Sequence, residues 1–219
     1  MSGFKLAIDG PAGSGKSTIS KLIAEKLKWT HIDTGAMYRA VTLEAIELGV
    51  DLNQESSYLF LETIHVHYDN HKIYINQRDV TNDIRKNEVT QNVSLVSSFP
   101  YVRKMMVDLQ QKAASEGNII MDGRDIGTVV IPNADLKIFL TAHLVERAKR
   151  RYQETVTKGK SANMNQVIED IEIRDIKDST RKESPLKKAD DAIELDTTHL
   201  SIDQVVEAII TKIPKNVLN

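Results

Sequence analysis

The sequence predicts an α/β fold in which a parallel β-sheet is covered by helices on both faces, and three observations support this. Short apolar runs alternate with longer segments of helical periodicity along most of the 219 residues. A glycine-rich loop joins the first predicted strand to the first predicted helix. A stretch that alternates apolar and polar residues interrupts the series, which predicts a small antiparallel β insert. Since no linker divides the chain, we expect residues 1–219 to form a single domain.

The glycine-rich loop follows an apolar run, Phe4 to Ile8, that is typical of a buried strand. Gly10 and Gly15 bracket four residues, and Lys16 and Ser17 come next, which gives the pattern G-x-x-x-x-G-K-[ST] of a phosphate-binding loop. The segment after the loop places four apolar residues on one helical face: Ile19, Leu22, Ile23 and Leu27. The alternative is an ordinary glycine turn with a surface lysine. The predicted strand before the loop and helix after it favour the phosphate-binding loop, because an ordinary turn needs neither.

The chemistry of this loop follows from its expected geometry, that of a P-loop NTPase-like fold. A glycine-rich backbone can direct its N–H groups at phosphate oxygens, and the start of the helix adds positive potential. We expect Lys16 to be exposed, outside the core, and to reach the β- and γ-phosphates of a nucleotide, with the Ser17 hydroxyl facing Mg²⁺. The predicted nucleotide-binding residues are Gly10, Pro11, Ala12, Gly13, Ser14, Gly15, Lys16, Ser17 and Thr18.

The elements up to residue 81 follow in chain order. A strand over Trp29–Asp33 leads into a helix over Ala36–Leu48 that stops at Gly49, and a short helix covers Gln54–Ile64. The antiparallel insert then has three strands, His65–Asp69, Lys72–Asn76 and Asp79–Thr81, with turns at Asn70-His71 and Gln77-Arg78. Together with its flanking helices, this insert spans about residues 60–98.

The second half of the chain returns to the strand–helix alternation. A helix over Ile84–Ser98 is broken at Phe99-Pro100, and Pro100 suits the first turn of the next helix. The predicted strands are Asn118–Met121, Leu136–Leu140 and Ala192–Leu195, and two charged helices cover Val145–Thr157 and Met164–Asp178. Ser201 and Gln204 predict a capping box for a final helix whose apolar face extends to Ile213.

Polar clusters follow two of the predicted strands, at the sheet edge where ligands bind in folds of this type. One cluster runs from Asp33 to Arg39 and the other from Asp122 to Asp125. Asp122 comes directly after four strand residues, the position expected of a carboxylate near the Mg²⁺ of a nucleotide. The alternative role for both clusters is helix capping, because Asp and Thr are common caps.

The two charged helices contain five arginines: Arg147, Arg150, Arg151, Arg174 and Arg181. Arg174, Asp178 and Arg181 are spaced so that they share one helical face. A solvated surface laced with ion pairs is one interpretation. The other is a helical lid over residues of about 147–178 that closes on the site, because phosphoryl transfer needs cations around the moving group and no water. The exposed tip of such a hairpin would be Lys158-Gly159-Lys160.

Composition limits the classes of partner and compartment. The formal net charge of -2 gives no basic excess for a nucleic-acid polymer. The chain has no cysteine, which suits a reducing cytoplasm, and no apolar run approaches the length of a membrane span. We therefore expect a cytoplasmic protein with small-molecule partners, no membrane partner and, since nothing calls for an oligomer, a monomeric state.

Four segments together resemble the bacterial cytidylate kinases, which belong to the nucleoside-monophosphate kinases. The resemblance covers nearly the whole chain, and the segments are Ile8–Thr18, Asp33–Arg39, Asp122–Thr128 and the run Arg174-Asp-x-x-Asp-x-x-Arg181. The phosphate loop is generic, whereas the other three segments together are specific. The resemblance implies transfer of the γ-phosphate of ATP to CMP or dCMP, with Mg²⁺, and implies that the insert is the CMP-binding subdomain.

The resemblance also implies roles for individual residues. Thr34, Tyr38 and Arg39 would hold the CMP phosphate, which Arg124 would also contact. Ser94, Arg103 and Asp125 would read the cytosine, and Asp178 with Arg181 would contact the ribose side. The expected catalytic cations are Lys16, Arg124, Arg151 and Arg174, and the expected metal-facing residues are Ser17 and Asp122. Two alternatives stay open: a kinase of another small acceptor, such as shikimate or dephospho-coenzyme A, and a nucleotide-dependent switch protein.

Overall fold

A five-stranded parallel sheet forms the centre of the molecule in the computed structural model, which describes residues 3–69, 71–157, 159 and 161–218. Its strands are β1 (Lys5–Asp9), β2 (Thr30–Asp33), β6 (Ile119–Gly123), β7 (Leu136–Thr141) and β8 (Ile193–Asp196). Their order across the sheet is β2-β6-β1-β7-β8, and every neighbouring pair is parallel. The predicted parallel α/β architecture is confirmed.

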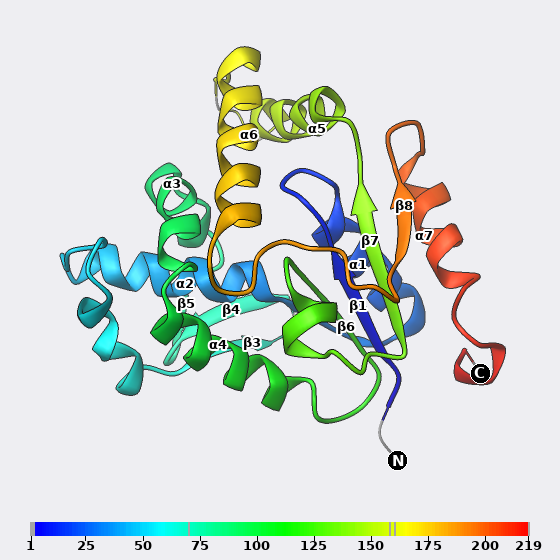
Figure 1. Cartoon of the computed structure of the whole chain (residues 1–219), viewed down its shortest axis with the longest axis horizontal. Helices are drawn as coiled ribbons and strands as arrows, with labels where there is room; N and C mark the ends of the chain where they lie inside the picture. The colour runs from blue at the N-terminus through cyan, green and yellow to red at the C-terminus, as the bar shows by residue number, and fades with distance from the viewer. Residues whose placement is uncertain (1–2, 70, 158, 160, 219) are drawn as a thin grey trace.

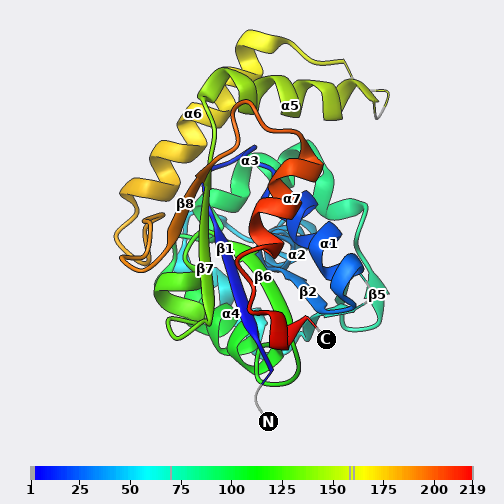
Figure 2. The ribbon, with the colours of Figure 1, turned by 90° about the vertical axis from the view of Figure 1, so that its right-hand side faces the viewer.

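Helices cover both faces of this sheet (Figures 1 and 2). The helices α1 (Lys16–Leu27) and α7 (Ile202–Ile210) pack with Leu6 and Ile8 in one core. The helices α2 (Thr34–Glu47), α3 (Asn87–Val96) and α4 (Pro100–Ala113) share the other core with Ala7. Successive residues of β1 therefore point to opposite faces, and both faces are apolar because helices cover both.

The insert is a three-stranded antiparallel sheet of β3 (Val66–Asp69), β4 (Lys72–Ile75) and β5 (Arg78–Asp79). The prediction placed the third strand at residues 79–81 and a turn at Gln77-Arg78, which is wrong by about one residue. Asn76 adopts a positive φ of 55° and so begins the turn earlier than predicted. At the other predicted turn His71 also has a positive φ, of 62°, and Asn70 lies outside the described residues.

Two helix predictions differ from the structure in their details. The segment Glu55–Glu62 is a 3₁₀ helix, and the helix expected over residues 84–98 divides into a 3₁₀ turn, Asp83–Arg85, and α3. The division falls at Lys86, whose backbone is extended. The predicted capping box is confirmed; α7 ends at Ile210, and Ile213 beyond it is still buried. A π-helical turn, Ile126–Val130, has no counterpart in the prediction.

A helical hairpin stands at the carboxyl end of the parallel strands (Figures 1 and 2). It consists of α5 (Leu144–Thr157), which follows β7, and α6 (Met164–Thr180). Both helices agree with the prediction within about three residues; of the predicted tip, Lys158 and Lys160 lie outside the described residues. Across the described ranges, no helix combines the length and apolar character needed to span a membrane.

Candidate active site

The phosphate loop connects β1 to α1 and owes its shape to its glycines. Gly13 and Gly15 have positive φ values of 75° and 90°, which favour glycine. At Gly10 a Cβ atom would lie 2.2 Å from the carbonyl oxygen of Leu140, so only glycine lets the loop approach β7 this closely. The first N–H groups of α1 have no acceptor within the helix and are available to an anion.

Lys16 is buried, so the expectation that it is exposed and outside the core is wrong. Its residue exposure is 6%, and its Nζ donates to the Pro11 carbonyl at 2.7 Å and to Ser14 Oγ at 3.3 Å. The ammonium is thus folded back across its own loop, where it has polar neighbours in place of water. A lysine in this position needs only a rotation of its side chain to meet a phosphate in the loop.

Ser17 and Asp122, the two residues that the sequence predicts to face a metal, meet beside the loop. Ser17 Oγ donates to Asp122 Oδ2 at 2.6 Å. The other carboxylate oxygen of Asp122 lies 2.7 Å from Nε2 of His31, a buried residue of β2. Although burial opposes it, this carboxylate raises the pKa of His31. The described residues contain no group of three or more acidic or histidine side chains arranged to hold a metal ion by themselves.

A narrow cleft between the sheet edge, α3 and α6 collects most of the predicted acceptor residues. Its volume is about 40 Å³. It is lined by Thr34, Gly35, Tyr38, Val93, Ser97, Arg103, Gly123, Arg124, Asp125, Arg174, Asp178 and Arg181. Of the insert range 60–98, the lining includes Val93 of α3 and Ser97, which caps the end of that helix. A cleft of this volume is closed relative to the several hundred Å³ that a nucleotide site needs.

Asp125 lies between two arginines at one end of this cleft. Its carboxylate accepts a hydrogen bond from Arg103 and is 3.5 Å from Arg181, and the side chains of all three residues are at most 5% exposed. The guanidinium of Arg103 also lies 5.5 Å from the centre of the Tyr38 ring. Burial raises the pKa of Asp125, although both arginines oppose the shift. Of the predicted base-reading residues, Arg103 and Asp125 are thus paired with each other, whereas Ser94 bonds to Asp178.

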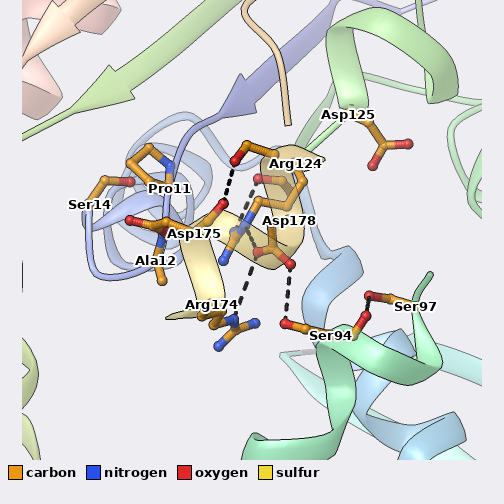
Figure 3. A network of polar contacts seen from close by, with 12 residues as sticks. Pro11, Ala12, Ser14, Ser94, Ser97, Arg124, Asp125, Arg174, Asp175 and Asp178 are labelled. Carbon is orange, nitrogen blue, oxygen red and sulfur yellow. Dashed lines mark hydrogen bonds and ion pairs between the residues drawn. The ribbon is translucent and has the colours of Figure 1, made fainter. Parts of the chain in front are cut away.

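Asp178 connects three elements around the cleft (Figure 3). It accepts from Ser94 Oγ of α3 at 3.1 Å and from Arg124 Nε, after β6, at 2.8 Å. Arg174, one turn earlier on α6, has its Nε 3.8 Å from the same carboxylate. Burial alone would raise the pKa of Asp178, but Arg124 and Arg174 outweigh it and hold that pKa below its usual range.

Several buried cations lie close to one another between the cleft and the phosphate loop. Burial and the nearby charge of Arg124 hold the pKa of Lys16 well below its usual value. The same two causes lower the pKa of Arg174 to about 10. Burial and then Arg174 lower the pKa of Arg39, whose Nη1 donates to Thr90 Oγ1 at 3.1 Å. Cations that depress one another's pKa in this way favour the binding of an anion among them.

The remaining predicted site residues occupy the margins of this group. Thr34 Oγ1 donates to the backbone carbonyl of Asp122 at 2.8 Å and so joins β2 to β6. The buried Tyr38 has its pKa raised to about 12, chiefly by burial. Arg151, on α5, pairs with Glu154 at 3.0 Å, and its charge contributes to the lowered pKa of Arg39 and of Arg174.

Sequence reasoning missed three side chains that organise the site. His31 supports Asp122, as described above. Arg147 was noted only as one of several arginines, yet its Nη1 donates to the Ala12 carbonyl in the phosphate loop at 2.7 Å. Asp175 accepts from the Ala12 N–H at 2.9 Å. The spacing of Asp175 and Asp178 placed them on one face of α6, and this was the available signal.

The fold and the site together define a P-loop kinase, since a phosphate loop opens a parallel sheet and a cationic hairpin stands above it. The structure of a gluconokinase from Sinorhizobium meliloti aligns with 96% of this chain and with 91% of its own chain, with a TM-score of 0.50 and 12% sequence identity. This similarity supports the fold.

Sequence comparison gives the family. The cytidylate kinase family profile matches residues 6–215. A cytidylate kinase of Acholeplasma laidlawii is 60% identical, with 100% of each chain covered. A cytidylate kinase of Fusobacterium nucleatum is 50% identical, and the alignment covers 98% of this chain and 99% of that protein. The chain belongs to the cytidylate kinase family.

Proposed function

We propose that the chain transfers the γ-phosphate of ATP to CMP or dCMP and forms ADP with CDP or dCDP. The observation that carries the proposal is the group of buried cations between the phosphate loop and the cleft. Lys16, Arg39 and Arg174 all have lowered pKa values, since they are buried and face other cations. Such a group stabilises phosphates, and in-line transfer between two phosphates needs positioning and charge stabilisation more than a protein base.

The donor phosphates are assigned to the loop residues 10–18. The N–H groups at the start of α1 face the anion, and Lys16 turns from the Pro11 carbonyl toward the β- and γ-phosphates. Arg124, Arg151 and Arg174 then surround the group in transit, where negative charge develops. The hairpin of α5 and α6 excludes water from this region, which limits transfer to water.

The acceptor is assigned to the cleft. Thr34, Tyr38 and Arg39 hold its phosphate, together with Arg124, and Asp178 and Arg181 face the ribose. Ser94, Arg103 and Asp125 read the base. A carboxylate at Asp125 can accept a hydrogen bond from the exocyclic amine of cytosine, which uracil lacks. Within the range 60–98, Val93 of α3 and Ser97 directly after α3 line the cleft, and this supports the insert range as the CMP-binding subdomain.

Mg²⁺ fits the oxygen ligands of Ser17 and Asp122. This ion prefers oxygen, keeps several waters and takes only one or two protein ligands beside the phosphates of its nucleotide. The hydroxyl and carboxylate lie 2.6 Å apart at the start of α1, beside the expected β- and γ-phosphates. When bound, the ion neutralises charge on the phosphates. His31 holds the outer oxygen of Asp122 and thereby orients the carboxylate.

The proposal includes a monomeric enzyme of the cytoplasm. The expectation of a monomer rests on the sequence, in which nothing calls for an oligomer. Sedimentation of the purified protein tests this part.

An acceptor panel tests the reaction. The protein is incubated with ATP and Mg²⁺ and with CMP, dCMP, UMP, AMP or shikimate, and nucleotide products are separated by chromatography. We expect ADP in a one-to-one ratio with CDP or dCDP, and kcat/KM highest for the two cytidine nucleotides. Slow ATP hydrolysis with no phosphorylated acceptor would instead indicate a switch protein, and phosphorylation of shikimate alone would indicate another small-molecule kinase.

A further inference from the structure

Helix α6 connects the two halves of the site through two carboxylates one turn apart. Asp178 contacts Ser94 and Arg124 on the acceptor side. Asp175, on the same helical face, contacts Ala12 in the phosphate loop. Figure 3 shows both carboxylates on this helix, with Ala12 on one side and Ser94 on the other. The predicted acceptor residues include Asp178, whereas Asp175 has no assigned role.

The contact between Asp175 and the phosphate loop is a closed ring of three residues. The N–H of Ala12 donates to Asp175 Oδ1 at 2.9 Å, and the carbonyl of Ala12 accepts from Arg147 Nη1 at 2.7 Å. Arg147 Nη1 also donates to the other oxygen of Asp175, which closes the ring. The side chains of Arg147 and Asp175 are 9% and 20% exposed, so water screens this ion pair only partly. Both polar groups of the Ala12 residue are thus held by the hairpin.

Apolar packing reinforces the same connection. Ala12 is 6% exposed and belongs to a small core with Ala148 of α5 and Ile171 of α6. The next residue of the loop, Gly13, lies close to α5: a Cβ atom built on Gly13 would be 3.1 Å from the backbone oxygen of Arg147. The first half of the phosphate loop is therefore part of the core of the hairpin. A change in the loop and a change in the position of α6 are mechanically linked.

The acceptor cleft is small in this structure, and α6 forms one of its walls. Its volume is about 40 Å³, whereas small-molecule sites measure several hundred Å³. Arg174 and Asp178 of α6 and Arg181 directly after it line the cleft. Space for an acceptor nucleotide therefore requires these side chains to be displaced, by rotation or by a shift of α6. A shift of α6 is the displacement that would alter the contacts of Asp178 and of Asp175 together.

We propose that Asp175 is a positioning residue that couples donor binding in the phosphate loop to acceptor binding beside Asp178; this rests on the proposed function. Donor phosphates fix the loop, and a fixed Ala12 peptide favours the contacts with Asp175 and Arg147. These contacts hold α6 where Asp178 and Arg181 can close on a bound acceptor. Coupling between two binding sites is reciprocal, so the acceptor strengthens donor binding by the same factor.

Two variants separate this role from a purely structural one. Asp175→Asn retains the size of the side chain and an oxygen for the Ala12 N–H, but it removes the charge opposite Arg147. Glu172→Gln makes the same change of charge on the same helix at an exposed residue and is the matched control. If the asparagine variant fails to fold, Asp175→Glu keeps the charge and displaces it by one methylene, and it takes the place of that variant.

The test is the affinity for CMP, measured by calorimetry with and without a non-hydrolysable ATP analogue and Mg²⁺. We expect the analogue to tighten CMP binding at least about fivefold in the parent protein and in Glu172→Gln. In Asp175→Asn we expect this factor to fall below about twofold, with the CMP affinity in the absence of the analogue changed less than about threefold. The KM for CMP at saturating ATP should rise accordingly, by more than kcat falls.

Each other outcome overturns the inference. A coupling factor in Asp175→Asn equal to that of the parent protein would show that Asp175 does not transmit the effect, and an equal loss in Glu172→Gln would assign it to general helix charge. A parent protein that forms CDP but shows no coupling would refute the inference and leave the proposed function intact. A parent protein that neither binds CMP nor forms CDP would refute the proposed function itself, independently of Asp175.

Discussion

The donor and acceptor halves of the site solve the problem of buried charge in opposite ways. On the donor side Lys16 has only neutral oxygens as hydrogen-bond partners, and its pKa is lowered by burial and Arg124. On the acceptor side Asp125 lies between Arg103 and Arg181, and Asp178 pairs with Arg124.

The comparison explains how selectivity can reside in one half only. A cation with neutral hydrogen-bond partners attracts any phosphate, whatever base the nucleotide carries. A paired carboxylate is fixed in position by its arginines and offers its remaining lone pairs in fixed directions, which suits recognition of a particular base edge. Variants on the donor side should therefore change the rate for every acceptor, and variants of the base-reading residues on the acceptor side should change the ratio between acceptors.

The largest effect is expected from Lys16→Ala on the donor side. Removal of a charged group that meets the transferring phosphate should lower kcat by about 10²–10³-fold for CMP and UMP alike. Because only the buried ammonium and its two hydrogen bonds are lost, we expect the protein to remain folded. Steady-state kinetics and thermal melting measure the two effects.

Lys21→Ala is the control for that variant. Lys21 lies on the same helix, half exposed, and its Nζ is 3.8 Å from Glu25. Exposed pairs of this kind contribute little, so both kcat and the melting temperature should stay close to the parent values. Near-normal turnover in Lys16→Ala, with the control also unaffected, would contradict the role of the phosphate loop.

Asp9 joins the two halves, and its titration should make the stability depend on pH. It ends β1 and accepts the N–H groups of Ile126 and Gly127, both at 2.8 Å, just after Arg124 and Asp125. Burial raises the pKa of Asp9 from 3.8 to about 6, despite those hydrogen bonds. The folded protein thus holds a proton that the unfolded chain releases, so stability falls as the pH rises from about 4 to about 6.

The size of that effect follows from the shift in pKa. One pKa unit corresponds to about 1.4 kcal/mol, so the free energy of unfolding should fall by about 3 kcal/mol over this interval and then level off. Asp9→Asn cannot titrate and should lack this part of the pH dependence. Urea unfolding of both proteins between pH 4 and pH 7 measures the difference, and parallel curves would contradict the assignment.

For the donor half, the sequence predicted the position of the phosphate loop but not the contacts of its residues. The motif around Lys16 indicated the loop, because a strand, a glycine-rich turn and a helix are local features. The same motif did not reveal that Lys16 is buried, since burial depends on elements that are distant in the sequence. Asp175 and Ala12 are 163 residues apart and meet only through the packing of α6, which no local pattern contains.

The acceptor half was predicted as a set of residues but not as a network. The resemblance to cytidylate kinases named Asp125, Arg103 and Arg181, and the structure brings all three to one cleft. Their mutual pairing and the connection from Asp178 to Ser94 were not predicted, because side chains from four separate elements must be placed first. The π-helical turn after Asp125 escaped prediction for the same reason: its first N–H groups bond to Asp9, on another strand.

A smaller effect, confined to the acceptor half, is expected from Asp125→Asn. An amide in place of the carboxylate keeps the volume, but it has one acceptor oxygen in place of two, for which the cytosine amine must compete with Arg103 and Arg181, and it lacks the negative charge. Loss of a base contact costs about 1–3 kcal/mol, so the ratio of kcat/KM for CMP over UMP should shrink by about tenfold to a hundredfold. The variant also leaves Arg103 and Arg181 without their carboxylate, and the absolute rates should therefore fall as well.

Arg39→Ala is the matched comparison for that ratio. Its guanidinium bonds to Thr90 and is assigned to the acceptor phosphate, which CMP and UMP share. We expect the rates for both acceptors to fall and the ratio to change by less than about threefold. If Arg39→Ala changes the ratio and Asp125→Asn does not, the division of the cleft into base-reading and phosphate-holding residues is wrong.

The smallest effect is expected far from both halves, at the capping box of α7, and it calibrates the others. Ser201 Oγ accepts from the Gln204 N–H at 3.2 Å, and Gln204 Oε1 accepts from the Ser201 N–H at 2.8 Å. Ser201→Ala removes one of these bonds and should lower the free energy of unfolding by about 1 kcal/mol.

Helix α7 packs on the face of the sheet opposite α2 and contributes no residue to the cleft. The variant should therefore melt earlier with kcat, KM and the CMP-to-UMP ratio all at parent values. If Ser201→Ala also changed the CMP-to-UMP ratio, a change of that ratio in Asp125→Asn could come from loosened packing and not from lost base recognition. In that case only variants matched in stability to Ser201→Ala would distinguish the two halves of the site.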